Sequence, residues 1–187
     1  MSALPADRSA ADRHGRKRRG WRRDQRGSTA VEFALVALPF LFILFSITEV
    51  CVANAVSAAL DNATNLAARQ IMTGQFTLTG SAATTAFKTK VCDQLKWLGS
   101  SCTSNLSVSV QTFAAFSNAT QPNVTVNGSF SDQNLAFGGS AAGSIVMVNT
   151  YLKWQLLTPY FLTGYNASKD GTTVFESTVA FRNEPYA

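Results

Sequence analysis

The stretch that decides the fold is "RDQRGSTAVEFALVALPFLFILF", which runs from Arg23 to Phe45. It passes from a charged segment through a glycine into an apolar run, and one glutamate, Glu32, stands at the head of that run. The uncharged residues Phe33 to Thr48 would span about 24 Å as a helix, slightly less than the ~30 Å hydrocarbon core of a bilayer. The run therefore predicts a membrane helix. Glu32 needs a local explanation, because a charge at the bilayer centre costs about 2.5–3.5 kcal/mol.

Positive charge is concentrated ahead of this run. Residues 1–26 carry nine Arg or Lys and three Asp or Glu, whereas the rest of the chain carries seven and eight. A basic arm can bind nucleic acid through its phosphates, but an arm beside an apolar run is typical of the cytoplasmic flank of a membrane helix. We therefore predict a cytoplasmic leader over residues 1–27, a single membrane helix over residues 28–56, an extracytoplasmic C-terminal domain and no nucleic-acid partner.

The helix is predicted to continue beyond the membrane. Residues 50–72 are rich in alanine, and Gly74 is a typical helix stop. Apolar residues recur at the 3–4 spacing of one helical face, which predicts a single helix from Ser28 to Met72 that is bent at Pro39. The predicted buried face consists of Ala53, Val56, Leu60, Ala63, Ala67 and Ile71.

The C-terminal part is predicted to add one short helix and a sheet. Residues 80–100 favour a helix with Ser81 as its cap and Gly99 at its end. Alternation of apolar and polar residues predicts antiparallel strands within residues 106–111, 124–130, 146–156 and 173–181. The predicted fold class is α+β: residues 57–187 form a domain whose four-stranded sheet packs on the alanine-rich part of the long helix.

The three cysteines are predicted to differ in role. Cys92 and Cys102 lie outside the cytoplasm in the predicted topology, so the oxidising environment favours a disulfide that joins the short helix to the sheet. Cys51 is expected to be a buried thiol. No CxxC motif is present, and the lone His14 belongs to the basic arm, so the sequence predicts no metal and no cofactor.

The sequence contains no recognisable catalytic motif. It has no HExxH, GxSxG or Walker loop, and no histidine outside the arm, so we predict no enzymatic activity. Trp97 and Trp154 are interpreted as core residues. Glu49, at the far end of the uncharged run, is either an interfacial charge or a contact with a partner helix.

The order of a glycine, an apolar run and a glutamate near the start of that run resembles the start of type IV prepilins and pseudopilins. Gly27 precedes the apolar helix, and Glu32 is the fifth residue after it. More narrowly, residues 26–70 resemble the TadE-like proteins of the tight-adherence (Tad) pilus system. The matching features are the "RG" before the run, "VEFAL", the internal proline, the glutamate near the end and the "AAR" at 67–69. A TadF-like relative is the alternative within that system.

The resemblance implies processing and assembly. In that family a membrane peptidase cuts after the glycine, here between Gly27 and Ser28, and the fifth-position glutamate, here Glu32, pairs with a neighbour's N-terminal amine. The implied partners are a prepilin peptidase, other Tad pilins or pseudopilins and the membrane assembly platform. The residues alone permit another interpretation of Glu32, as the N3 partner of a capping box begun by Thr29.

Two functions from different classes follow. The first is a minor pilin or pseudopilin of a Tad-type pilus, in the membrane or incorporated in the filament, that acts by helix–helix association. The alternative is a signal-anchored surface module that is never processed and binds a ligand or mediates adhesion. Processing after Gly27 distinguishes the two.

Overall fold

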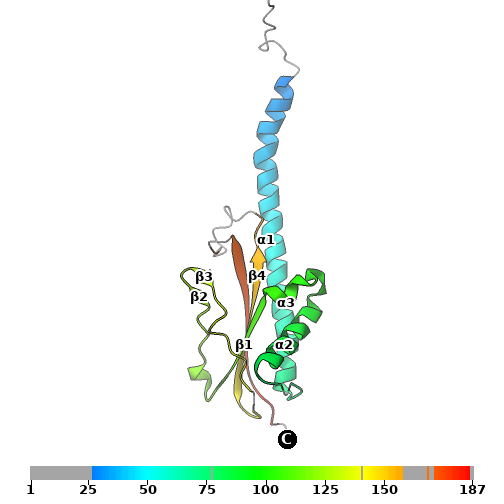
Figure 1. Cartoon of the computed structure of the whole chain (residues 1–187). Helices are drawn as coiled ribbons and strands as arrows, with labels where there is room; N and C mark the ends of the chain where they lie inside the picture. The colour runs from blue at the N-terminus through cyan, green and yellow to red at the C-terminus, as the bar shows by residue number, and fades with distance from the viewer. Residues whose placement is uncertain (1–26, 77, 140, 158–167, 169–170, 186–187) are drawn as a thin grey trace, which may run out of the picture. The chain divides into compact units, whose positions relative to one another are not determined.

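The computed structural model describes residues 27–76, 78–139, 141–157, 168 and 171–185 (Figure 1). The predicted basic leader, with His14, lies outside the described residues apart from Gly27. The chain divides into two compact units, residues 1–41 and 42–187. The described part has a long N-terminal apolar helix, further helices and an antiparallel sheet, which confirms the predicted α+β class.

Helix α1 (Ser28–Met72) has the predicted bounds, and Pro39 lies inside it. Gly74 adopts φ 71°, a conformation that glycine accepts readily, and the amide of Thr73 donates to the carbonyl of Arg69 at 3.0 Å. All six residues of the predicted inner face are buried: Ala53, Val56, Leu60, Ala63, Ala67 and Ile71. The small side chains on this face allow the helix to lie close to the sheet.

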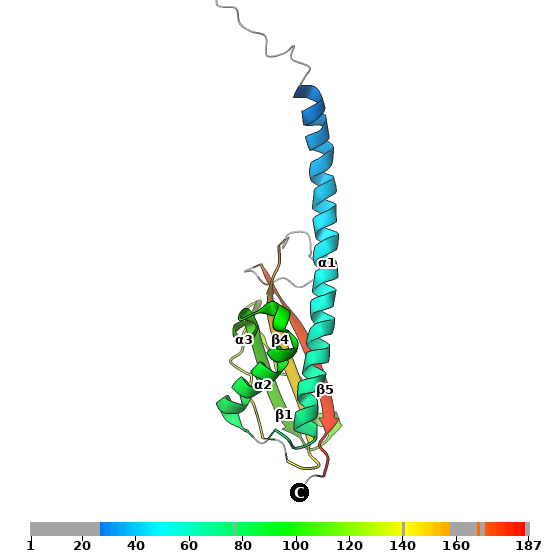
Figure 2. The same cartoon turned by 90° about the vertical axis from the view of Figure 1, so that its right-hand side faces the viewer.

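The main sheet is antiparallel and has the strand order β1–β4–β5 in the described part of the chain. Its strands are β1 (Leu106–Phe113), β4 (Ile145–Gln155) and β5 (Thr172–Arg182), and β5 runs alongside α1 (Figure 2). A buried hydrogen bond of 2.7 Å joins the hydroxyls of Thr64 and Thr150, and so ties α1 to the central strand. The apolar face of the sheet and the inner face of α1 thus form one core.

The second helical region differs in detail from the prediction. Helix α2 (Gly80–Gln94) has Thr79 and not Ser81 at its N-cap position, without a side-chain cap. A 3-10 turn, η3 (Lys96–Leu98), precedes Gly99, and a short helix that the sequence did not predict, α3 (Ser101–Asn105), follows it. Four apolar residues at helical spacing, Phe87, Val91, Leu95 and Leu98, turn one side of this region toward the core, where the first three are buried and Leu98 is partly buried.

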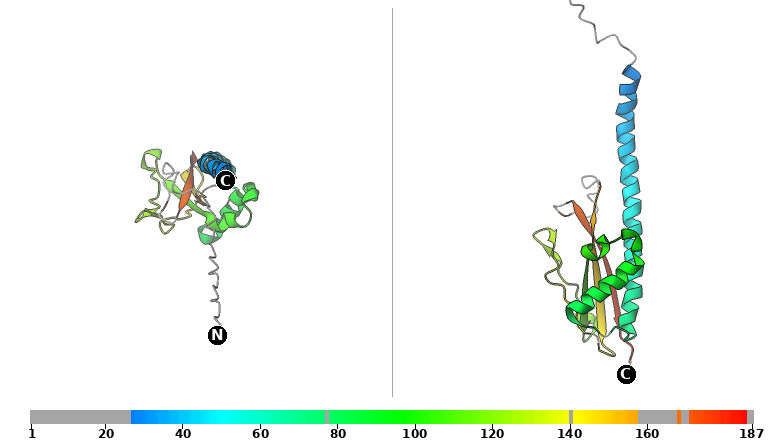
Figure 3. Two further views of the ribbon diagram at one scale, coloured as in Figure 1. Left: turned by 90° about the horizontal axis from the view of Figure 1, so that it is seen from above. Right: turned by 45° about the vertical axis from the view of Figure 1, so that its right-hand side comes forward.

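The prediction of a strand over residues 124–130, as one of four in the sheet, was wrong, because the main sheet of the described residues has three strands. This segment forms a hairpin of two short strands, β2 (Thr125–Val126) and β3 (Ser129–Phe130), apart from the main sheet. Asn127 and Gly128 both have positive φ, 54° and 76°, which is the turn conformation that an Asn-Gly pair favours. The hairpin and the turn η4 (Phe116–Asn118) belong to a long connection that crosses the sheet face opposite α1 (Figure 3).

The predicted disulfide between Cys92 and Cys102 is confirmed, but it joins α2 to the short helix α3 and not, as predicted, to the sheet. Replacing both cysteines with serine is expected to lower the free energy of unfolding by about 3 kcal/mol, because an open loop of this length has more conformations to lose on folding. Denaturant unfolding of the oxidised chain and the double variant measures the difference. An unchanged unfolding midpoint would show that the bridge contributes nothing to stability.

Candidate functional site

The start of α1 carries the predicted processing and assembly residues. Gly27 immediately precedes the helix, and Ser28 is its first residue. The hydroxyl of Ser28 donates to Glu32 Oε1 at 3.1 Å, and both side chains are exposed. The structure therefore brings Ser28 and Glu32 together on one turn of the helix, with the carboxylate open to other molecules.

The capping-box interpretation of Glu32 was wrong. Thr29 lies within the first turn of α1 and not at the position before it. The carboxylate of Glu32 accepts from a side-chain hydroxyl one turn away, and not from the backbone amide that a capping box would use. The start of α1 therefore does not hold Glu32 in a capping box.

Gly27 has no structural requirement for glycine within its own chain. Its φ lies outside the left-handed region, and a Cβ atom added there would meet nothing within 4 Å. By contrast, Gly99 and Gly128 adopt the positive φ that L-residues rarely accept. A side chain at position 27 would therefore cost the described structure nothing.

The first part of α1 is covered with exposed apolar side chains. In the described part of the chain, α1 is the helix that is long and apolar enough to cross a membrane. Large apolar residues lie on every side of it, as is typical of a membrane span and unlike the single stripe of a surface helix. They are Val31, Phe33, Leu35, Val36, Leu38, Phe40, Leu41, Phe42, Ile43, Leu44, Phe45 and Ile47.

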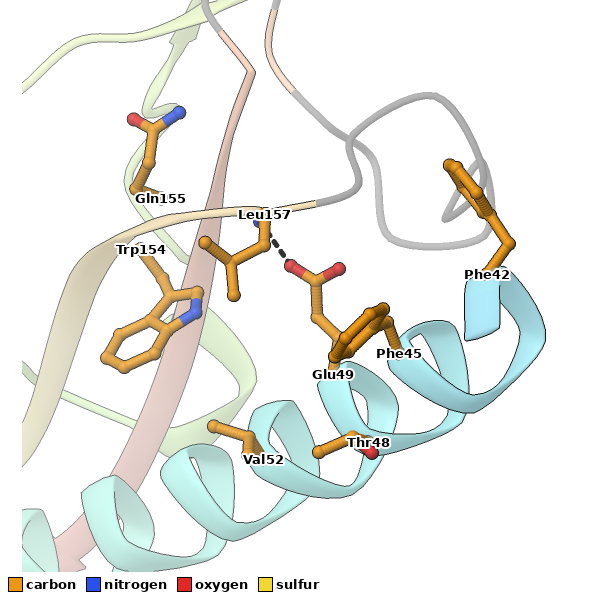
Figure 4. Close-up of a pocket in the computed structure, with 8 residues that line it drawn as sticks. All are labelled: Phe42, Phe45, Thr48, Glu49, Val52, Trp154, Gln155 and Leu157. Carbon is orange, nitrogen blue, oxygen red and sulfur yellow. Dashed lines mark hydrogen bonds between the residues drawn. The ribbon is translucent and has the colours of Figure 1, made fainter. Parts of the chain in front are cut away.

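Glu49 ends this run, and its side chain turns toward its own domain. It is only 7% exposed, and its carboxylate accepts a hydrogen bond from the backbone amide of Leu157, just beyond β4 (Figure 4). The residue is thus part of an intrachain contact between α1 and the end of the central strand. The predicted contact between Glu49 and a partner helix stays a prediction.

A pocket of about 470 Å³ adjoins this contact (Figure 4). One wall belongs to α1 and the other to the end of β4 and the residues after it. Its lining is predominantly apolar: Phe42, Phe45, Thr48, Glu49, Val52, Trp154, Gln155 and Leu157. Sequence reasoning missed this pocket, because the residues of its two walls are about a hundred positions apart.

Two expectations about burial near this region were wrong. Cys51, expected to be buried, is an exposed free thiol, because it lies on the side of α1 away from the sheet. Trp97, expected in the core, is 57% exposed, while Trp154 is half-buried. The two indole rings lie side by side, with centroids 6.4 Å apart.

A polar cluster lies on the opposite face of the sheet. Thr178 Oγ1 donates to Asn149 Oδ1 at 2.8 Å, and Tyr151 stands across the strands from Glu176. Burial of Tyr151, followed by the negative charge of Glu176, raises the pKa of the Tyr151 hydroxyl, which stays neutral in the folded chain. Within the described ranges, no group of three or more His, Cys, Asp or Glu side chains could hold a metal ion.

Comparison with known protein families finds a similarity in the first part of the chain. Residues 27–69 match the model of the family described as TadE-like protein, which confirms the resemblance predicted from the sequence. The match begins at Gly27 and includes Glu32 and Glu49. It implies a protein associated with the Tad pilus, and the apolar helix in the same residues suggests a single-pass membrane protein. Comparisons with curated proteins and with solved structures gave no match.

Proposed function

We propose that this chain is a minor pilin or pseudopilin that takes part in the assembly of a Tad-type pilus. It acts by association of membrane helices and not by catalysis. The observation that carries the proposal is the exposed Glu32 carboxylate at the start of an apolar helix, within the residues that match the TadE-like family. A carboxylate in that position is costly in a membrane unless a partner compensates its charge.

The proposed placement follows from charge and hydropathy. The basic residues of the leader stay in the cytoplasm, α1 crosses the inner membrane once, and the sheet domain lies outside. The disulfide between Cys92 and Cys102 suits a domain in an oxidising compartment. The proposed partners are a prepilin peptidase, other Tad pilins or pseudopilins and the membrane assembly platform.

Gly27 is proposed as the residue after which the peptidase cuts. Because the fold itself does not require glycine there, a requirement imposed by another protein is the simpler explanation. A residue without a side chain lets a protease approach the backbone closely. Cleavage would remove the basic leader, whose repeated positive charges would oppose close packing of several helices.

Cleavage also creates the charge that Glu32 needs. A free amine on Ser28 would lie one turn from Glu32 of its own chain, at the same end of α1. In a bundle of such helices, the amine of one copy and the carboxylate of a neighbour can compensate each other near the lipid edge. Glu49, whose carboxylate already binds the amide of Leu157, is proposed to remain at the opposite end of the span.

Processing can be tested on the wild-type chain. The mature protein is expected to consist of residues 28–187 and to begin with Ser28, because cleavage after Gly27 removes the whole leader. Intact-mass measurement of protein from cells with an active prepilin peptidase gives the answer, and cells that lack the peptidase serve as the control. A mature chain that retains its leader would favour the unprocessed, signal-anchored binding module.

A further inference from the structure

We propose that the end of the domain next to Glu49 contacts the bilayer, and that the pocket there holds an acyl chain of a phospholipid from the adjacent leaflet. The proposal concerns a second membrane contact, in addition to the helix that crosses the membrane. It rests on α1 being a membrane span, and it does not depend on processing after Gly27 or on pilus assembly.

The position of the pocket along α1 places it at a membrane surface. From Glu32 to Glu49 the helix rises about 26 Å, close to the ~30 Å thickness of the hydrocarbon core. The helical wall of the pocket contains Phe42 and Phe45, which belong to the uncharged run itself. An acyl chain beside α1 would therefore reach the pocket along an apolar surface, without passing a charged side chain on the way.

The opposite wall of the pocket has the chemistry of a membrane-facing surface. Leu157, which lines the pocket, is 87% exposed, so it adds to the apolar surface that begins with the exposed side chains of α1. Trp154, which also lines the pocket, packs against Trp97, which is more than half exposed. Tryptophan is enriched where a protein meets the boundary between headgroups and acyl chains, because the indole combines a large apolar ring with one N–H donor.

The charges nearby suit a phospholipid. Lys96 is exposed beside Trp97 on η3, so its ammonium group can reach a phosphate while its stem lies on apolar surface. The carboxylate that borders the pocket, Glu49, is buried and accepts the Leu157 amide, so it does not face incoming phosphates as a free charge. The pocket volume of about 470 Å³ also lies in the ~300–1,000 Å³ range of small-molecule sites.

Tryptophan quenching by brominated lipid tests this contact directly. The full-length chain carries tryptophan at positions 21, 97 and 154, so Trp21→Phe combined with Trp97→Phe leaves Trp154 as the reporter in the pocket wall. The chain is reconstituted in phosphatidylcholine and phosphatidylglycerol vesicles whose acyl chains carry bromine close to the glycerol end. Trp154 emission is expected to lose most of its intensity relative to unbrominated vesicles, and to lose less when bromine lies near the chain terminus.

Matched substitutions connect the quenching to the pocket. Leu157→Asn keeps the backbone amide that binds Glu49 but makes the rim polar, and it is expected to reduce the quenching of Trp154 clearly. Phe116→Asn is the control: Phe116 is 55% exposed and follows the opposite end of β1, so its replacement should leave the quenching unchanged. Formation of the Cys92–Cys102 disulfide in each variant checks that the domain has folded.

Three outcomes would overturn the proposal. Equal Trp154 emission in brominated and unbrominated vesicles would show that lipid does not reach the pocket. Quenching that is the same in Leu157→Asn and in the parent chain would place the lipid elsewhere. Quenching that appears only when the chain is diluted to about one copy per vesicle would identify a second copy of the chain, and not lipid, as the preferred occupant.

Discussion

Glu32→Gln is expected to give a chain that is processed normally and fails to enter a pilus. Glutamine has nearly the shape of glutamate, and its amide oxygen can still accept the hydrogen bond from Ser28, so the start of α1 should be unchanged. The variant lacks the negative charge that would compensate a neighbour's amine. Two measurements separate the effects: the mass of the mature chain reports processing, and the amount of chain in pili sheared from cells reports assembly.

Gly27→Leu serves as the comparison, because it is expected to block processing, which Glu32→Gln leaves intact. The structure leaves open space around Gly27, so leucine should fold without strain, and a failure here reflects the peptidase and not the fold. This variant should retain its leader and consequently be absent from pili. If Glu32→Gln assembled as well as the wild type, Glu32 would have no role in charge pairing, and the exposed carboxylate would need another explanation.

The long helix could be predicted almost completely from the sequence. Its bounds, its stop at Gly74 and its buried face all depend on local signals: an uninterrupted apolar run, a regular 3–4 spacing and a glycine with positive φ. The disulfide was predictable for a similar reason, because Cys92 and Cys102 are close in the sequence and the topology placed both in an oxidising compartment. Strong periodicity leaves few alternative conformations for such segments.

The errors in the sheet arose where a local turn signal competed with an alternating pattern. Residues 124–130 alternate like a strand, but Asn127 and Gly128 together favour a tight turn, and the turn determined the structure. Trp97 was misassigned because an aromatic residue is usually buried, and sequence alone does not show that η3 leaves the indole outside the core. Each error concerns an element of only a few residues.

The candidate site also has a part that the sequence could predict and a part that it could not. Gly27, Ser28 and Glu32 form one continuous motif, so the sequence identified them together. The partner of Glu49 could not be predicted, because the amide of Leu157 lies 108 residues away and carries no side-chain signal. The pocket beside it exists only once α1 and the end of β4 are packed together.

Phe87→Ala is expected to lower the free energy of unfolding of the domain by about 3–5 kcal/mol. Phe87 is fully buried, and its ring lies 6.0 Å from that of Phe76 and 5.9 Å from that of Phe137. Phe76 follows α1, and Phe137 forms a bridge with β1, so this ring joins three separate parts of the fold. Alanine would leave a cavity where these parts of the fold meet.

The loss of stability is measured by denaturant unfolding of the full-length chain in detergent, with tryptophan fluorescence as the readout. Phe116→Ala removes the same side chain from an exposed site, 55% accessible, and should change the free energy of unfolding by less than about 0.5 kcal/mol. The difference in unfolding free energy between the two variants therefore measures the effect of burying the phenyl ring, separately from the effect of removing it. Equal unfolding midpoints for the two would contradict a core in which Phe87 links α2 to the end of α1 and to the edge of the sheet.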